Sequence, residues 1–459
     1  MGPTTKSTFR LLLTASGLEA LYFTLRTYGD LRERVPDTVL LWMLSGVFYM
    51  ISCYLAQTFS GDGTHRNGIS TVGLILAAAI LFRLTAWGIP PTLSDDIYRY
   101  RWEGRLQAAG GNPYQEVPND PKWQSLRDSA FVRVAGKDFK GGYGPLAEQL
   151  ELITYNVVDK LTHDPASQIR WFRLPSAMAD LGILAVLLVL LKTKHIAPER
   201  VLLYAWCPLP ILEFWSAGHN DVLAVFFVAL CLLAVSSDRQ VLAILALFLA
   251  ISVKWWPIVL LPALLFRRTR HPWRDSLAGC GAGVVLLLIL SFKYWSDVSY
   301  NVDFMTGFLG GWRNNDSLFG LVRWLSGGER VAKYVTLGLV GTAALAFSCT
   351  RWPLERKMLA TVAAMLALSA NVHPWYLTWL FPLLVLEFQP ALMLFVLLCP
   401  VFYGNITEWY ALGQWRAVTA DRWLVYVPVY GYALASIALK AVAGQRRSPK
   451  TGTTGIDPA

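Results

Sequence analysis

The chain has 459 residues, of which 54% are hydrophobic and only 16% are charged, and its mean hydropathy is +0.41. This composition excludes an ordinary soluble domain and predicts an integral membrane protein. The formal net charge of +10 does not indicate a nucleic-acid partner, because the Lys and Arg residues stand in short clusters between apolar runs. We therefore expect an all-α polytopic membrane protein that binds no nucleic acid.

Many apolar runs approach the length of about 20 residues that a membrane-spanning helix needs. The expected spans lie near residues 11–28, 38–58, 71–89, 174–191, 201–217, 220–236, 275–293, 331–350, 358–371, 374–388, 390–404 and 424–440. Together with the broken segment described next, they predict a bundle of about 12–14 transmembrane helices.

The apolar segment 240–266 differs from the others, because as one helix it would measure about 40 Å and exceed the hydrocarbon thickness of about 30 Å. Pro257 predicts a break near Lys254-Trp255-Trp256-Pro257. Non-helical backbone at membrane depth needs hydrogen bonds from protein or from a wet cavity. We expect this segment to line a cavity and Lys254 to face an anion, for which a lipid-phosphate oxygen is suited. Arg83, near the end of its span, is expected to snorkel to the interface.

The topology follows from an even number of segments and from the distribution of charge. Both termini are expected on one side, and the short connections on that side carry more Lys and Arg, so the positive-inside rule predicts cytoplasmic termini. The long loop 90–173 is then extracytoplasmic, as are the shorter loops 294–330 and 405–422. Function is expected to concentrate on this face, because long loops are usually functional.

The long loop opens with Ser94-Asp95-Asp96-Ile97-Tyr98-Arg99-Tyr100, directly after the third span. One interpretation is structural, since carboxylates in a first helical turn complement the helix dipole. The other is catalytic: desolvation near the membrane and the neighbouring acid would raise the carboxyl pKa values, which suits Asp96 or Asp95 to general-base chemistry. Arg99 and Arg101 are then close enough to hold a phosphate-bearing substrate.

Three further polar runs are expected on the same face. Gly218-His219-Asn220-Asp221 lies between two spans, where a tight turn with a capped helix is the alternative to a functional site. Gly310–Asp316 and Asn371–Tyr376 are weaker signals, because a lone His and interfacial Trp or Tyr residues need no ligand. Groups from such separated regions can converge on one outer pocket. The candidate substrate-binding residues are His219, Asn220, Asp221, Lys254, Arg313, Asn314, His373 and Tyr376.

Taken in order, these motifs resemble those of bacterial GT-C glycosyltransferases. The matching runs are Ser94–Arg105, Gly110–Tyr114, Gly218–Asp221, Lys254–Pro257 and His373–Tyr376. The similarity covers residues 70–440 and is greatest to the glycosyltransferase 87 and PIG-M-like mannosyltransferase group. It departs from that group in two respects: Tyr143-Gly144-Pro145 stands where relatives often have Tyr-Pro-Pro, and two spans precede the usual first one.

The resemblance implies an inverting enzyme that uses a polyprenyl-phosphate sugar and has an essential Asp in an outer loop. The family pattern of an Asp two residues before a Tyr matches Asp96 and Tyr98, so Asp96 is the first candidate for the base and Asp95 the second. The implied reaction transfers a hexose, with mannose the expected one, to a lipid-linked or glycan acceptor on the outer face, among membrane lipids. No cofactor or metal ligand is assigned, although paired carboxylates would allow a divalent metal.

The resemblance implies a two-span extension over residues 1–70 and a GT-C-like catalytic domain over residues 71–442. The polar composition of residues 443–459, rich in Gly, Thr and Pro, predicts a disordered cytoplasmic tail. Two other classes of protein remain open. A lipid or solute transporter, or a flippase with a buried cationic site, also has broken helices and intramembrane charges, although the second half has no counterpart to the long loop. A non-catalytic assembly subunit or sugar-lipid binder with the same fold is the other class.

Overall fold

The computed structural model describes residues 3–59, 68–267, 269, 271–297, 313–412 and 419–447. Parts of four predicted segments lie outside them: residues 298–312 of the second outer loop, including Gly310-Gly311-Trp312, residues 413–418 of the third, residues 60–67 of the extension, and residues 448–459 of the tail. In the described residues the chain is helical, with an isolated parallel β-bridge between Asn314 and Asn371. The predicted all-α class is confirmed.

The helices of the bundle correspond to most of the predicted spans, although two of them, Leu318–Ser326 and Gly404–Leu412, lie in segments that were predicted as loops. They are α1 (Pro3–Thr27), α2 (Val35–Phe59), α3 (Gly68–Trp87), α7 (Leu174–Thr193), α10 (Asp221–Ser236), α11 (Gln240–Val253), α12 (Leu261–Leu265), α13 (Pro272–Ser291), α15 (Leu318–Ser326), α16 (Glu329–Cys349), α17 (Leu354–Leu368), α18 (Phe381–Leu386), α19 (Pro390–Leu398), α20 (Gly404–Leu412) and α21 (Thr419–Arg447). The long loop 90–173 contributes α4 (Asp96–Ala108), η2 (Pro121–Leu126), η3 (Ser129–Arg133), α5 (Pro145–Leu161) and α6 (Pro165–Trp171).

Six helical segments in the described part of the chain are long and apolar enough to cross a membrane. They are Leu31–Ala56, Pro165–Thr193, Pro272–Trp295, Glu329–Cys349, Pro390–Trp409 and Thr419–Lys440. Shorter apolar helices, such as those over Thr71–Trp87 and Asp221–Ser236, accompany them. The protein is therefore a multi-pass membrane protein, whereas the larger count of spans stays a prediction.

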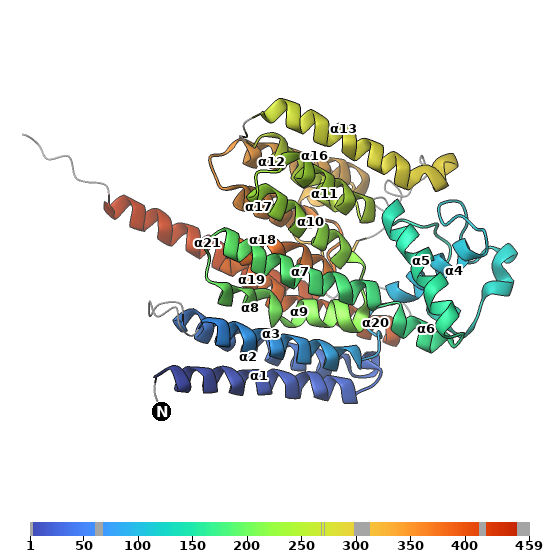
Figure 1. The fold of residues 1–459 in the computed structure, drawn as a ribbon, viewed down its shortest axis with the longest axis horizontal. Helices are drawn as coiled ribbons and strands as arrows, with labels where there is room; N and C mark the ends of the chain where they lie inside the picture. Colours follow the sequence, from blue (N-terminus) through green and yellow to red (C-terminus); the bar gives the residue numbers. More distant parts are fainter. Residues whose placement is uncertain are drawn as a thin grey trace, which may run out of the picture.

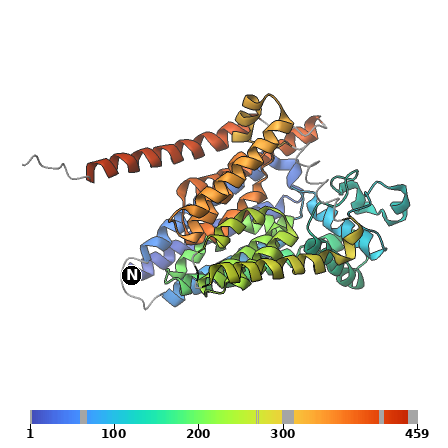
Figure 2. The ribbon, with the colours of Figure 1, turned by 90° about the horizontal axis from the view of Figure 1, so that it is seen from above.

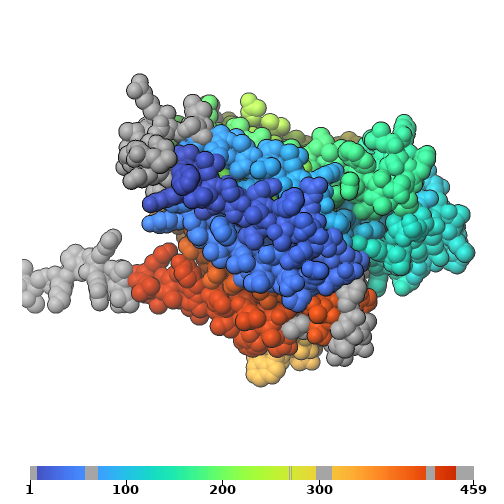
Figure 3. Space-filling view, turned by 90° about the horizontal axis from the view of Figure 1, so that it is seen from below, coloured from blue at the N-terminus to red at the C-terminus, as the bar shows by residue number. Residues whose placement is uncertain are grey.

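Figure 1 shows the bundle helices lying alongside one another, with α4, α5 and α6 gathered at one end. The start of α1 and the end of α21 lie at the opposite end, and the view from above in Figure 2 agrees. In Figure 3, the surface of the N-terminal helices adjoins that of the C-terminal helices, and the loop again lies at one end. The long loop thus covers the end of the bundle remote from α1's first residues, whichever side of the membrane that is.

The predicted spans 201–217 and 374–388 are among those that are not single α-helices. The segment 201–217 divides into η4 (Pro198–Val201), α8 (Leu202–Ala205), α9 (Pro208–Ile211) and the π-helix η5 (Leu212–Ala217). Pro208 and Pro210 lack the amide hydrogen that a continuous helix would use. The segment 374–388 begins as the 3-10 helix η8 (Pro374–Leu380) before α18. Both segments are almost wholly buried, so protein surrounds the irregular backbone, as the bilayer requires.

Arg83 does not snorkel, contrary to our expectation. Its side chain is fully buried, and its Nε lies 2.6 Å from Oδ2 of Asp180 on α7. The same carboxylate accepts hydrogen bonds from the Tyr204 hydroxyl (2.5 Å) and from Trp215 Nε1 (2.8 Å). A buried cation is tolerated when a counter-ion and hydrogen bonds surround it. This ion pair joins α3, α7, α8 and η5 at the centre of the bundle.

The predicted break after α11 is confirmed. Lys254 has extended backbone angles, and the chain continues through the 3-10 helix η6 (Trp256–Leu260) into α12. The outer loop reaches this point, because the amide of Gly144 donates a hydrogen bond of 2.9 Å to the carbonyl of Val253. The loop therefore supplies a partner to one of the carbonyls that the end of α11 leaves open.

Candidate active site

Asp95 and Asp96 turn in different directions at the start of α4. The Asp96 carboxylate is one-quarter exposed, and its Oδ2 lies 3.5 Å from Nδ1 of His219. Asp95 instead accepts a hydrogen bond of 2.8 Å from Arg133 Nε, and Arg133 also donates to the Tyr98 hydroxyl. The two carboxylates therefore do not face one common point. Asp96 alone faces the interior of the bundle.

The pKa values of the two acids shift in opposite directions. Burial raises the pKa of Asp95 by more than the nearby Arg133 lowers it. Burial also raises the pKa of Asp96, but the hydrogen bond and charge of His219, followed by the charges of Lys254 and His373, reverse the shift and lower it overall. The expectation of a raised pKa is therefore wrong for Asp96. This carboxylate is ionised at neutral pH and is surrounded by groups that stabilise its charge.

His219 is positioned by the π-helix η5 and the left-handed turn that follows. Gly218 has φ +77, and a Cβ there would lie 2.7 Å from Arg173 Cγ and 3.0 Å from Ile97 Cδ1, so only glycine lets the turn lie against α4. The imidazole is fully buried, with Nε2 3.3 Å from Oε2 of Glu213. Each ring nitrogen of His219 thus faces a carboxylate, one from Asp96 and one from Glu213.

Glu213 is a candidate residue that the sequence did not reveal. It is 1% exposed, and its Oε1 accepts a hydrogen bond of 2.7 Å from the Tyr403 hydroxyl. The available signal was an acid inside an apolar run, which is a functional candidate by default. In the structure Glu213 lies beside His219 Nε2, on the side of the ring away from Asp96.

Aromatic rings join His219 to His373. The Trp375 ring stacks on the His219 ring at 4.1 Å between centroids and on the His373 ring at 4.3 Å. Nδ1 of His373 lies 3.3 Å from Nδ2 of Asn314. The side-chain oxygen Oδ1 of Asn314 accepts a hydrogen bond of 2.7 Å from Nδ2 of Asn405. The predicted runs around residues 219, 314 and 373 therefore meet in space, although they are far apart in the chain.

Lys254 has a protein counter-ion in the structure, and a lipid-phosphate oxygen as a further partner stays a prediction. Its Nζ lies 2.8 Å from Oδ2 of Asp221, which is fully buried, while the lysine side chain is 19% exposed. The other Asp221 oxygen accepts from Trp379 Nε1 at 2.7 Å. The ammonium group also lies over the rings of Tyr376 (5.2 Å) and Tyr143 (5.7 Å), a favourable cation–π geometry.

The remaining candidates on the bundle lie at the margin of this group. Asn220 accepts a hydrogen bond of 3.2 Å from the Tyr100 hydroxyl and helps to line a cavity of about 30 Å³ beside α5. Arg313 is paired with Asp316 (3.0 Å), which also pairs with Arg422 at 2.9 Å. Tyr376 stacks on Trp379, with ring centroids 4.5 Å apart. Asn220 thus connects the site to the loop helices, and Arg313 belongs to a separate ion-pair cluster.

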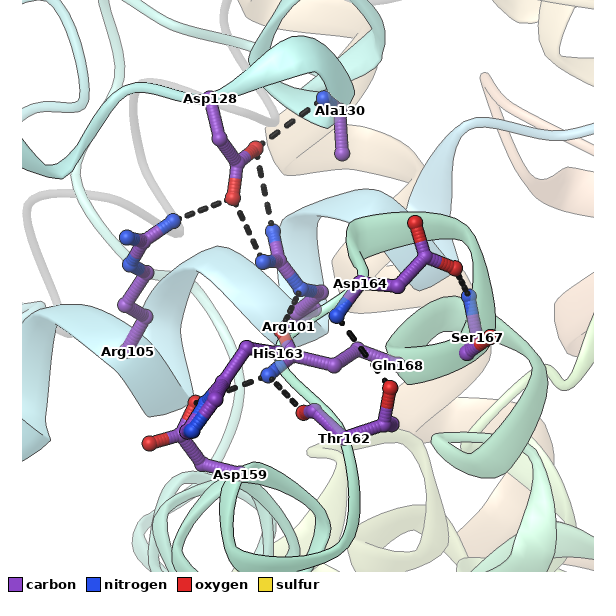
Figure 4. Close-up of polar contacts among 10 residues, drawn as sticks. All are labelled: Arg101, Arg105, Asp128, Ala130, Asp159, Thr162, His163, Asp164, Ser167 and Gln168. Atoms are coloured by element: carbon purple, nitrogen blue, oxygen red, sulfur yellow. Dashed lines mark hydrogen bonds and ion pairs between the residues drawn. The ribbon is translucent and has the colours of Figure 1, made fainter.

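Arg99 and Arg101, the predicted phosphate ligands, are occupied within the loop. Arg99 donates to Glu103 Oε1 (2.7 Å) and to the carbonyls of Gly136 and Phe139. Figure 4 shows Arg101 directed at Asp128 and Gln168, which it contacts at 2.6 and 2.7 Å.

Helix geometry explains the position of Arg101, since five residues along α4 turn the chain by about 140° away from Asp96. The Asp128 carboxylate is shared with Arg105, which approaches it from the next turn (Figure 4). Together with Arg99, these ion pairs hold the loop onto α4. The structure does not bring either arginine together with Asp96.

Gly144 offers a test of the contact between the outer loop and the break at Lys254. A Cβ at Gly144 would overlap the backbone carbonyl of Ser252, which cannot rotate away. We expect Gly144→Ala to shift the start of α5 and to lower the activity of the site by about 10²-fold, the usual effect of a displacement near 1 Å. Gly281→Ala is the control, because nothing lies within 4 Å of its Cβ position. Equal activity in the two variants would show that the contact is dispensable.

The arrangement combines the elements of an acid–base site at the end of the bundle where the long loop lies. An ionised carboxylate, a lysine at a helix break and two histidines approach from α4, the η5–α10 turn, the end of α11 and the start of η8. Most of these side chains are buried, where electrostatic interactions are stronger than in water. Such a set can accept a proton on one side and stabilise a developing negative charge on another.

Comparison with known protein families gives two matches. The family model described as Alpha-(1->6)-mannopyranosyltransferase, N-terminal domain, matches residues 17–270 and so includes the C-terminal part of α1 and all of α2. The model of Glycosyltransferase family 87 matches residues 168–374. No curated protein matches the chain, and no solved structure does. The two matched regions together contain Asp96, His219, Lys254 and His373.

Proposed function

Because the chain belongs to the alpha-(1->6)-mannopyranosyltransferase family, which makes it a glycosyltransferase, we propose that it transfers mannose from a polyprenyl-phosphate donor with inversion at the anomeric carbon. The acceptor is a lipid-linked or glycan chain on the outer face of the membrane. One observation carries the proposal: Asp96 lies 3.5 Å from His219, and the Trp375 ring that stacks on His219 also stacks on His373.

In the proposed reaction, Asp96 is the general base. An acceptor hydroxyl attacks the anomeric carbon, its proton passes to the Asp96 carboxylate, and the bond from that carbon to the phosphate oxygen breaks. Because the transition state resembles an oxocarbenium ion, the hydroxyl becomes acidic only as the new bond forms. A base with a lowered pKa is then sufficient, since it is ionised in the resting enzyme and receives the proton late.

The leaving phosphate takes the electron pair of the broken bond and therefore needs a cation. Lys254 is the proposed partner, because it is held at a helix break by Asp221 (2.8 Å) and remains partly exposed. A fixed donor of this kind contributes about 2.7–4 kcal/mol to transition-state stabilisation. His373 lies on the opposite side of the Trp375 ring from His219 and is a proposed contact to the sugar or its phosphate.

The linkage in the family's name gives the proposal a stereochemical consequence. Formation of an α-(1→6) bond with inversion requires a donor whose mannose is β-linked to phosphate. The acceptor group is then a primary 6-hydroxyl, which carries the proton that Asp96 removes. We propose a β-mannosyl polyprenyl phosphate as donor and a mannose-terminated chain as acceptor.

The experiment uses the purified full-length protein in lipid nanodiscs. It is incubated with β-mannosyl polyprenyl phosphate, with the α-linked anomer and with a nucleotide-linked mannose, each in the presence of an α-mannoside acceptor. We expect product only from the β-linked lipid donor, with an α anomeric signal by NMR. Product from the nucleotide donor alone would overturn the choice of donor, and product of retained configuration would overturn the general-base mechanism.

The same preparation distinguishes the transporter class. In proteoliposomes, movement of the lipid-linked or free sugar across the bilayer is measured without acceptor. We expect no flux above protein-free liposomes. Flux together with the absence of transfer for every donor would contradict the enzymatic proposal and favour transport.

A further inference from the structure

Three glutamates form a buried cluster between α4 and α5, apart from the proposed active site. Glu103 and Glu148 are fully buried, and Glu151 is 7% exposed. One carboxylate oxygen from each lies within 4.8 Å of those of the other two. Buried acids at this distance repel one another and lose their hydration, so the cluster requires a compensating charge or proton.

Four carboxylate oxygens of the cluster have no hydrogen-bond partner in the described residues. Glu103 Oε2, Glu148 Oε1 and both oxygens of Glu151 are buried without a hydrogen bond. The other oxygens of Glu103 and Glu148 do have donors, since Arg99 Nε reaches Glu103 Oε1 at 2.7 Å and Gln107 Nε2 reaches Glu148 Oε2 at 3.1 Å. Each of these two carboxylates is thus held on one side and open on the other.

The orientation of Gln107 is itself fixed from outside the cluster. Its Oε1 accepts hydrogen bonds from the Tyr294 hydroxyl (2.7 Å) and from Lys293 Nζ (3.0 Å). The amide nitrogen must therefore point toward Glu148. Hydrogen bonds that orient a ligand from behind are the usual second layer of a metal site. The backbone of Gly141 closes another side, because a Cβ there would lie 3.0 Å from oxygens of both Glu103 and Glu148.

We propose that Glu103, Glu148 and Glu151 bind a divalent cation of the calcium class. Carboxylate oxygens are the ligands that hard cations prefer, and two ligands on opposite sides of Ca²⁺ are about 4.6–5.2 Å apart, which the observed spacing accommodates. Arg99 offsets one of the carboxylates, so the two remaining negative charges match a divalent ion. The unpartnered oxygens supply one ligand each from Glu103 and Glu148 and a bidentate pair from Glu151.

The alternative is that the acids share protons. Burial, and then the charge of Glu103, raise the pKa values of Glu148 and Glu151 well above the usual value, which favours the protonated form when no cation is bound. A protonated carboxyl needs an acceptor for its hydrogen. Protonation therefore accounts for the burial but leaves the open side of the cluster without a positive centre.

A cation at this point would hold α4 and α5 together. Glu103 lies two turns along α4 from Asp96, and Glu148 and Glu151 lie in the first two turns of α5, whose N-cap is Gly144. The ion would therefore fix the helix that carries the proposed base relative to the loop segment that contacts the Lys254 break. This role is structural and does not depend on the proposed reaction.

The experiment measures binding by the full-length protein in detergent after removal of metals with a chelator. Titration with ⁴⁵Ca²⁺ is expected to show one saturable site per chain. Titration with Mn²⁺, followed by the loss of the electron paramagnetic resonance signal of the free ion, is expected to give the same number of bound ions per chain. Glu151→Gln should abolish this binding. Gln107→Leu, which removes only the supporting amide, should weaken it about 10- to 100-fold.

Glu116→Gln is the matched control, because Glu116 lies in the same loop in a surface ion pair with Lys122 and should bind as the wild type does. Thermal unfolding checks the fold of each protein, and Ca²⁺ should raise the Tm of the wild type but not of Glu151→Gln. Absence of saturable Ca²⁺ and Mn²⁺ binding by the wild type would overturn the proposal. So would binding of equal affinity by Glu151→Gln.

Discussion

The Asp96→Asn variant is expected to transfer mannose about 10²- to 10⁴-fold more slowly than the wild type, the range that general-base catalysis contributes. The amide keeps the shape of the carboxylate but cannot accept the acceptor's proton. It also removes the charge that faces His219 Nδ1 at 3.5 Å. The loss should appear in kcat, because the proton moves only in the transition state.

Asp95→Asn is the matched control for this experiment. The substitution removes the same charge one residue away, but Asp95 faces Arg133 rather than the interior, so the loss of transfer should be much smaller. Rates are measured with the β-linked lipid donor, and the Tm of each variant confirms folding. Transfer at the wild-type rate by Asp96→Asn would remove the proposed base, and an equal loss in both variants would indicate a structural role for the pair.

The Asp180→Asn variant is expected to lower the free energy of unfolding by about 3–5 kcal/mol, because it leaves Arg83 buried without its counter-ion. Both side chains are fully buried, so no solvent can take over the charge. The Tyr204 hydroxyl and the Trp215 indole also lose the charged acceptor that they share. Since the amide has the shape of the carboxylate, the loss cannot be attributed to a cavity.

A double variant separates the charge from the packing. Arg83→Met with Asp180→Leu replaces the ion pair by apolar side chains and should recover most of the stability, as replacements of buried pairs often do. Unfolding is followed in mixed detergent micelles. Asp238→Asn, which removes an exposed partner of Arg267, should change the stability by no more than about 1 kcal/mol. If Asp180→Asn were as stable as the Asp238→Asn control, Arg83 would have to reach water in the folded protein.

The sequence was informative where a residue type has a strong local effect. Pro257 and the length of the apolar segment predicted the break at Lys254, and the polar runs around residues 96, 219, 314 and 373 were correctly expected to meet. Residue types alone could not pair these groups. Lys254 and Asp221 were both candidates, but their 2.8 Å contact depends on how α10 and α11 pack, which no local pattern encodes.

The errors arose where tertiary contacts override local chemistry. Two arginines near a carboxylate looked like phosphate ligands, yet loop carbonyls and Asp128 occupy them. Glu213 was hidden within an apolar run, because the π-helix that turns it toward His219 has no clear signature in the sequence. Glu103, Glu148 and Glu151 form no recognisable motif in the sequence, and only the packing of α4 on α5 places them together.

The hydrogen bond from Gly144 to Val253 has a consequence for protein engineering. An exchange of the outer loop between related enzymes would transplant one half of an interface whose other half lies in the end of α11 and in η6. Chimeras cut at residues 90 and 173 should therefore accumulate poorly, whereas chimeras that also carry residues 240–265 from the same parent should assemble. A transfer of acceptor specificity through the loop would then require the exchange of both segments together.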